Sequence, residues 1–114
     1  ISPSQLISFS YRTENLIVAS ADLTINLKKK TTKKNIQKVF KDFEKNQKFK
    51  IIKNINEPLV SLDFKNSKFS CNVDHRWIEL NKNTLKMILW YDNEAGYSSN
   101  LVNQIIYVNS QNLN

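Results

Sequence analysis

The beginning of the chain alternates hydrophobic and polar residues in the manner of β-strands. Residues 6–12 alternate loosely, and residues 16–27 form a longer run with the two-residue period of a strand. In this run one face would carry Leu23, Ile25 and Leu27, and the other face would carry Asp22, Thr24 and Asn26. We therefore expect two strands, the second with one face turned toward a core.

The next segment has the periodicity of a helix. Four hydrophobic side chains follow the i, i+3, i+4, i+7 spacing of one helical face: Ile36, Val39, Phe40 and Phe43. Thr31 or Thr32 can cap its start, and Asn46 suits a left-handed end. Lysines at the start oppose the helix dipole, so this helix depends on packing its apolar face against a sheet.

Five short strand-like segments follow, separated by asparagines that act as turn residues. They cover residues 48–52, 58–64, 68–73, 76–80 and 83–91. A last helical segment runs from about Glu94 to Val108 with an apolar stripe, and the polar residues 109–114 are expected to fray.

These elements predict a single α+β domain. The simplest packing is a mainly antiparallel or mixed sheet with one helix on its face and one C-terminal helix. The length of 114 residues fits one domain, and 40% hydrophobic residues are enough for a folded core.

The chain is basic, with a formal net charge of +7, but this charge does not indicate a nucleic-acid partner. Arg12 and Arg76 are the two arginines among 17 basic residues, and specific nucleic-acid readers rely on arginine. The abundance of Lys, Asn and Ile, which share A/T-rich codons, accounts for the charge equally well. The lysine-rich run Lys28–Lys34 is more typical of a solvated face than of a phosphate-binding site.

Three residue types occur once each and exclude several classes of site. A single glycine, Gly96, excludes a dinucleotide-binding Gly-rich turn or a P-loop within this chain. A single cysteine, Cys71, and a single histidine, His75, exclude an internal disulfide and the common zinc sites. No apolar run approaches the length of a membrane span. We expect a cytoplasmic protein without a bound metal or a membrane contact.

One segment is much more specific than the rest, namely Trp-Tyr-Asp-Asn-Glu-Ala-Gly-Tyr-Ser at residues 90–98. It resembles the C-terminal signature Trp-Tyr-Asp-Asn-Glu-x-Gly-Tyr-Ser of the phosphorylating glyceraldehyde-3-phosphate dehydrogenases. Upstream segments agree in order: residues 21–24 resemble the family's Asp-Leu-Thr strand, and residues 58–64 resemble its Pro-Leu-Val-Ser-x-Asp-Phe segment. The sister family of erythrose-4-phosphate dehydrogenases is similar too, especially at residues 70–74 and 88–90, and these residues do not separate the two.

The resemblance implies a fragment of an NAD-dependent sugar-phosphate aldehyde dehydrogenase of the EC 1.2.1 type. In that family a cysteine attacks the aldehyde, hydride passes to nicotinamide, and phosphate or water cleaves the resulting thioester. Residues 1–114 would form the later half of the catalytic domain plus the C-terminal helix, and the N-terminal NAD-binding domain would be absent. This chain alone would be inactive, whereas the intact enzyme would be a homotetramer. Without the missing domain, the apolar stripe at Leu101, Val102, Ile105 and Ile106 would stay partly exposed.

The resemblance assigns roles to three residues. Asn93 matches the signature asparagine whose amide holds the nicotinamide carboxamide, a suitable role because an amide both donates and accepts hydrogen bonds. Tyr97 would pack near the nicotinamide or, equally, only along its helix. Arg12 aligns with an arginine that binds phosphate, although the family reads Arg-Val-Pro-Thr where this chain reads Arg-Thr-Glu-Asn.

No catalytic residue is predicted in this chain. Cys71 is not within the family's Ser-Cys-Thr-Thr-Asn motif, and no helix start or nearby cation would lower its pKa. His75 does not match the catalytic histidine, and we expect it in a surface turn.

Two alternatives remain. The chain could be a non-catalytic relic of such an enzyme, as the altered segment after Arg12 and an expected loop at residues 75–77 suggest. It could also be a basic binding module that uses Lys28–Lys34 on nucleic acid.

Overall fold

The fold is the α+β arrangement that the sequence predicts. The computed structural model describes residues 2–11 and 18–111. Its strands are β1 (Leu6–Tyr11), β2 (Val18–Asn26), β3 (Ile52–Ile55), β4 (Cys71–Asn81) and β5 (Thr84–Asp92). Its helices are α1 (Lys33–Asn46), α2 (Ala95–Gln111) and two short 3-10 turns, η1 (Pro3–Gln5) and η2 (Ser61–Phe64).

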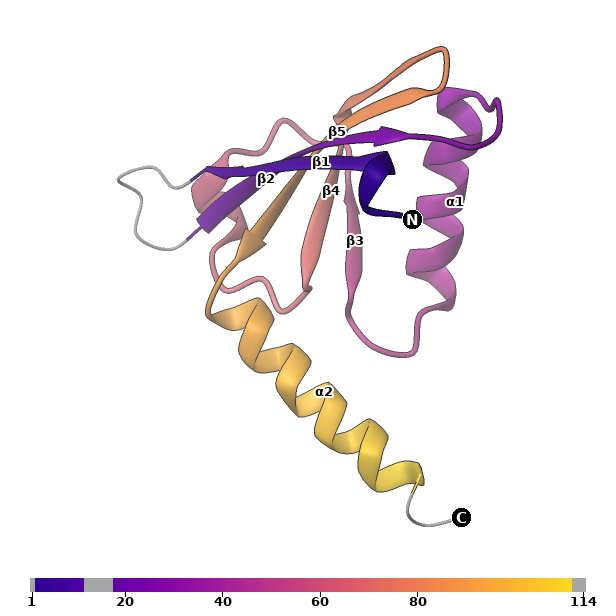
Figure 1. Cartoon of the computed structure of the whole chain (residues 1–114). Helices are drawn as coiled ribbons and strands as arrows, with labels where there is room; N and C mark the ends of the chain where they lie inside the picture. Colours follow the sequence, from indigo (N-terminus) through magenta and orange to yellow (C-terminus); the bar gives the residue numbers. More distant parts are fainter. Residues whose placement is uncertain (1, 12–17, 112–114) are drawn as a thin grey trace.

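The five strands form one mixed sheet in the order β1-β2-β5-β4-β3 (Figure 1). All neighbours are antiparallel except β3 and β4, which run parallel. The five steps along β4 from Asp74 to Glu79 lie opposite only two steps along β5, from Ile88 to Lys86. The surplus residues form a bulge, which bends β4 and changes the direction of the side chains within it.

Helix α1 covers the part of one sheet face that β3 and β4 form (Figure 1). Its N-terminal cap is as expected, because the Thr32 hydroxyl accepts a hydrogen bond from the Asn35 N–H at 3.2 Å. The predicted left-handed end at Asn46 was wrong: Asn46 is the last helical residue, and the chain leaves the helix through Gln47 in an extended conformation. Ile36 and Phe40 pack against a core of four buried residues, Val73, Ile78, Leu85 and Met87. The sheet covers only part of the predicted apolar face of α1. Val39 and Phe43, on the same predicted face, stay exposed.

Several strand predictions between residues 48 and 80 were wrong. Residues 58–64 form no strand, and η2 occupies their second half, where the Asp63 carboxylate accepts from the Val60 N–H at 2.7 Å. The segment at 48–52 begins its strand later, at Ile52, and the two segments at 68–73 and 76–80 belong to the single strand β4. The bulge between Asp74 and Glu79 accommodates the residues that join these two segments, so that both belong to one strand.

Helix α2 leaves the end of β5 and extends away from the sheet (Figure 1). Toward its C-terminal end, Tyr107 forms an edge-to-face pair with Phe49, with ring centroids 6.4 Å apart. The predicted stripe is exposed by 46–59%, at Leu101, Val102, Ile105 and Ile106. Among the described residues, no helix is long and apolar enough to cross a membrane.

Candidate functional site

The turn that carries the sequence signature is held by the carboxylate of Asp92. One of its oxygens accepts hydrogen bonds from the backbone N–H groups of Glu94 and Ala95, both at 2.9 Å. The other oxygen accepts from the Asn66 N–H at 2.8 Å. Asp92 therefore starts α2 in the manner of an N-cap and also fastens the loop before β4 to the same turn.

These contacts fix the charge of Asp92. The side chain is only 2% exposed, and burial by itself would raise its pKa. The three backbone donors, with a smaller contribution from the charge of Lys65, outweigh burial and hold the pKa of Asp92 below its usual range. The carboxylate is therefore ionised at neutral pH, and its charge favours the positive N-terminal end of α2.

Gly96 allows the loop and the helix to approach closely. A methyl group at this position would lie 2.8 Å from the backbone carbonyl oxygen of Phe69. Backbone atoms cannot move aside as the end of a flexible side chain can, so glycine is required here for steric reasons. This contact brings residues 69–70 against the first turn of α2.

Asn93 and Tyr97 line a hollow of about 320 Å³ in this turn. Ser70, Gly96 and Asn100 line it too, so the hollow joins the signature segment to the start of β4. Asn93 is half-buried in its wall, whereas Tyr97 is 70% exposed at its edge. The structure thus places Asn93 and Tyr97 side by side, as their common motif implies.

Ser70 is a member of this site that sequence reasoning missed. Its hydroxyl oxygen is buried and has no hydrogen-bond partner within the described part of the chain. A serine carries little distinguishing signal, and its position depends on a loop that is tied to β5 through Asn66 and Asp92.

An ion pair between a buried carboxylate and a partly exposed guanidinium anchors β5 just before the site. The Asp74 side chain is fully buried and receives two hydrogen bonds from the Arg76 guanidinium, at 2.9 and 2.6 Å. Trp90 donates its indole N–H to the same carboxylate at 3.2 Å and stacks on Phe64. Burial raises the pKa of Asp74, but the Arg76 and Trp90 hydrogen bonds outweigh it and hold that pKa below normal. The spacing of Asp74 and Arg76, two residues apart on one strand, is a signal that could have revealed this pair.

His75 is not in a surface turn, and that prediction was wrong. It is only 4% exposed within β4, with its ring edge-to-face against Phe40. Its Nε2 lies 2.6 Å from the Asn54 side-chain oxygen. Because the Asn54 amide nitrogen donates to the Phe40 carbonyl and to Glu44, that oxygen can only accept. Neutral His75 therefore carries its proton on Nε2.

The environment of His75 favours the neutral ring. Burial lowers its pKa, and the charge of Lys41 lowers it further, while the carboxylates of Asp74 and Glu44 act weakly in the opposite direction. Its Nδ1 is buried without a partner among the described residues, so a second proton would have no acceptor there.

Cys71 has the properties of an unactivated thiol. Burial raises its pKa to about 11, so it is protonated at neutral pH. His75 follows four residues later on β4, about 13 Å away at the usual rise of a strand, too far to act as its base.

Arg12 lies outside the described residues, so its phosphate contact stays a prediction. The described residues contain no group of three His, Cys, Asp or Glu side chains that could hold a metal ion.

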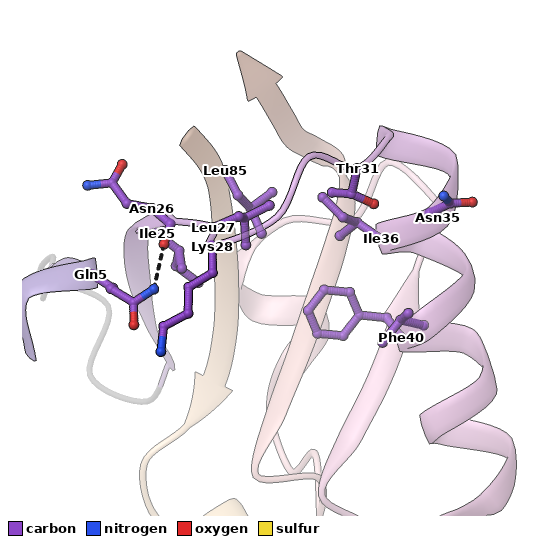
Figure 2. A pocket seen from close by; sticks show the side chains of 11 residues that line it. Gln5, Ile25, Asn26, Leu27, Lys28, Thr31, Asn35, Ile36, Phe40 and Leu85 are labelled. Carbon is purple, nitrogen blue, oxygen red and sulfur yellow. Dashed lines mark hydrogen bonds between the residues drawn. The ribbon is translucent and has the colours of Figure 1, made fainter. Parts of the chain in front are cut away.

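A second hollow, of about 470 Å³, lies between β2 and α1. Figure 2 shows Ile36 and Phe40 of α1 on one side of it and the aliphatic side chains of Ile25, Leu27 and Leu85 on the other. Leu85 and Asp92 stand at opposite ends of β5, about 23 Å apart at the usual rise of a strand. This apolar hollow is therefore separate from the Asn93 site.

The family is defined by comparison with known proteins. The model of the glyceraldehyde 3-phosphate dehydrogenase C-terminal domain matches residues 3–93. The chain therefore belongs to this family of oxidoreductases, and its mixed sheet and two helices fit that domain.

Named relatives give the same result. The chain is 33% identical over 105 residues to the cytosolic glyceraldehyde-3-phosphate dehydrogenase of Chlamydomonas reinhardtii, covering 91% of this chain and 31% of the relative. It is 36% identical over 107 residues to the cytosolic glyceraldehyde-3-phosphate dehydrogenase 3 of Zea mays, covering 93% and 32%. It is 35% identical over 108 residues to glyceraldehyde-3-phosphate dehydrogenase 1 of Giardia intestinalis, covering 94% and 32%. The chain spans about a third of the length of these relatives.

Proposed function

We propose that this chain supplies the nicotinamide-contacting turn and part of the catalytic-domain sheet of an NAD-dependent glyceraldehyde-3-phosphate dehydrogenase. The observation that carries the proposal is the position of Asn93, half-buried in the wall of a hollow rather than free in solvent. The names of the relatives favour glyceraldehyde 3-phosphate as the substrate over erythrose 4-phosphate.

The residues around the hollow fit a carboxamide. The Asn93 amide can pair with a carboxamide as both donor and acceptor, which would fix the face that the ring presents. Tyr97 offers an aromatic surface at the edge, and the unpartnered Ser70 hydroxyl is a further polar group in the wall. NAD, when bound, supplies the hydride acceptor for aldehyde oxidation.

The chemistry itself requires groups outside this chain. The thiol of Cys71 is protonated at neutral pH, and His75 is buried too far along β4 to activate it. We infer that the nucleophile, its base and the nucleotide-binding domain belong to a preceding portion, and that residues 1–114 alone are inactive. Arg12 would contribute a phosphate contact. The cytosolic names of two relatives support a cytoplasmic location, and a homotetramer is the expected assembly of the intact enzyme.

A titration with nicotinamide mononucleotide tests the Asn93 contact directly on this chain. We expect the amide signals of Asn93, Tyr97 and Ser70 to shift in a heteronuclear NMR spectrum, with weak affinity because the adenosine half has no domain to bind. Asn93→Ala should abolish the shifts, whereas Asn109→Ala, on the exposed end of α2, should preserve them. Shifts of equal size with adenosine monophosphate, or none at the turn, would contradict the contact.

A chimera tests the activity. This chain would replace the matching C-terminal third of the Chlamydomonas reinhardtii relative, and NAD reduction would be followed with glyceraldehyde 3-phosphate and with erythrose 4-phosphate. We expect turnover with the first aldehyde and a loss of roughly tenfold or more in kcat/KM on Asn93→Ala. A folded, tetrameric chimera without turnover on either aldehyde would favour the relic.

A further inference from the structure

A cavity of about 430 Å³ opens beside β3, at the edge of the sheet. Its floor contains three buried side chains: Ile55 on β3, Phe64 on η2 and Asn72 on β4. None of its lining residues lines the Asn93 hollow, so the two are separate sites.

Four lysines surround this cavity: Lys50, Lys53, Lys65 and Lys68. All four are exposed, and within residues 2–11 and 18–111 no ion pair neutralises any of them. Two lysines elsewhere in the described part of the chain do form ion pairs, Lys33 with Glu79 and Lys86 with Asp22.

The single carboxylate in the lining does not compensate for these charges. Asp63 accepts the Val60 N–H at 2.7 Å and thereby caps η2, and it forms no ion pair with the lysines. The lining holds four ammonium groups against one carboxylate; Glu57 and Asp92, outside the lining, interact electrostatically with Lys53 and Lys65, and the net charge around the cavity stays positive. A concave surface with one sign of charge concentrates the field and attracts an anion.

The walls that carry the lysines are joined by hydrogen bonds. The Ser70 N–H donates to the Lys50 carbonyl at 3.3 Å, which connects the segment before β3 to the loop before β4. In that loop the Ser67 N–H donates to the Phe64 carbonyl at 3.1 Å, and its hydroxyl donates to Asn72 at 3.2 Å. The lysine stems therefore start from a fixed frame, which lowers the ordering cost of binding.

We propose that this cavity, hereafter the four-lysine cavity, binds a small polyphosphate, either an inorganic chain or the triphosphate group of a nucleotide. Lysine is suited to phosphate as a compact point charge with three donors, and several linked phosphoryl groups match several separated ammonium groups. The four lysines line one open concave site instead of lying along a stripe, which favours a compact ligand over a nucleic-acid strand.

Calorimetric titration of the 114-residue chain with inorganic triphosphate, at 20 and 150 mM NaCl, tests this proposal. The quadruple variant Lys50→Gln, Lys53→Gln, Lys65→Gln and Lys68→Gln should bind at least tenfold more weakly at 150 mM NaCl. The matched control replaces Lys28, Lys29, Lys30 and Lys34 with glutamine. It loses the same charge outside the cavity and should change affinity less than threefold. ATP and adenosine are titrated in the same way. If ATP binds as tightly as inorganic triphosphate, the cavity recognises the phosphate chain alone; if ATP binds much more tightly, the ligand is a nucleotide. Adenosine, which has no phosphate, should not bind.

Amide shifts in the unmodified chain provide an independent readout that does not depend on the variants folding. Triphosphate should shift residues 50–53 and 65–69 and leave the amide of Asn93 unmoved. The proposal is overturned if triphosphate does not bind at 20 mM NaCl or if the shifts lie elsewhere. Equal losses in the two quadruple variants, or a single-stranded oligonucleotide that binds more tightly than triphosphate, would also overturn it.

Discussion

Replacing Asp92 with alanine removes three hydrogen bonds at once, two to the start of α2 and one to Asn66. Loss of an N-cap costs about 1 kcal/mol, and a partly buried N–H left without its acceptor costs about 1–2 kcal/mol more. We expect Asp92→Ala to lower the free energy of unfolding by about 2–3 kcal/mol.

Urea denaturation followed by circular dichroism measures this loss. At a slope of roughly 1.5 kcal/mol per M for a chain of this size, the midpoint should fall by roughly 1.3–2 M. Asp92→Asn keeps one acceptor oxygen and should show about half the loss. Asp42→Ala, which removes a carboxylate from the exposed side of α1, is the matched control and should shift the midpoint by less than about 0.3 M.

Asp92 should also make the stability of the chain depend on pH in a defined direction. The folded-state pKa of Asp92 is depressed, so its contribution is complete above the unfolded value of about 3.9 and is lost as pH falls through the folded value. The stability difference between the unmodified chain and Asp92→Asn should therefore be constant near neutrality and shrink in acid. A midpoint for Asp92→Ala equal to that of Asp42→Ala would refute the role given to this carboxylate.

Three further predictions concern two buried residues, Gly96 and His75, and the half-buried Cys71. Gly96→Ala would place a methyl group against the Phe69 carbonyl, so we expect a loss of about 1–3 kcal/mol in urea denaturation and shifted amide signals at the start of α2; an unchanged midpoint would contradict the close contact. Because the folded pKa of His75 is lowered, stability should fall as pH drops below about 6.5, and His75→Gln should flatten that part of the stability curve; a stability that rises toward acid in this range would reverse the assigned sign. The Cys71 thiol, with a pKa of about 11, should react with a disulfide reagent at pH 8 at least tenfold more slowly than in urea; equal rates would exclude its burial.

The candidate site could be located from the sequence only where residues stand together in the chain. Asn93 and Tyr97 were found because they share a nine-residue segment with an unusual order of aromatic and polar residues. Ser70 was missed because it reaches the hollow through a loop whose position depends on a long-range hydrogen bond between Asn66 and Asp92. The four-lysine cavity was missed for the same reason: its lysines belong to two segments that only the sheet edge brings together.

Local periodicity determined much of the secondary structure. The alternation before residue 27, the threonine cap and the helical spacing after it depend on neighbouring residues, so the sequence alone was sufficient to predict β1, β2 and α1. Tertiary structure decided whether Val39 and Phe43 were covered and whether residues 71–81 formed one strand or two. It also decided that His75 is buried, because the bulge in β4 and the packing of α1 depend on contacts between segments far apart in the chain.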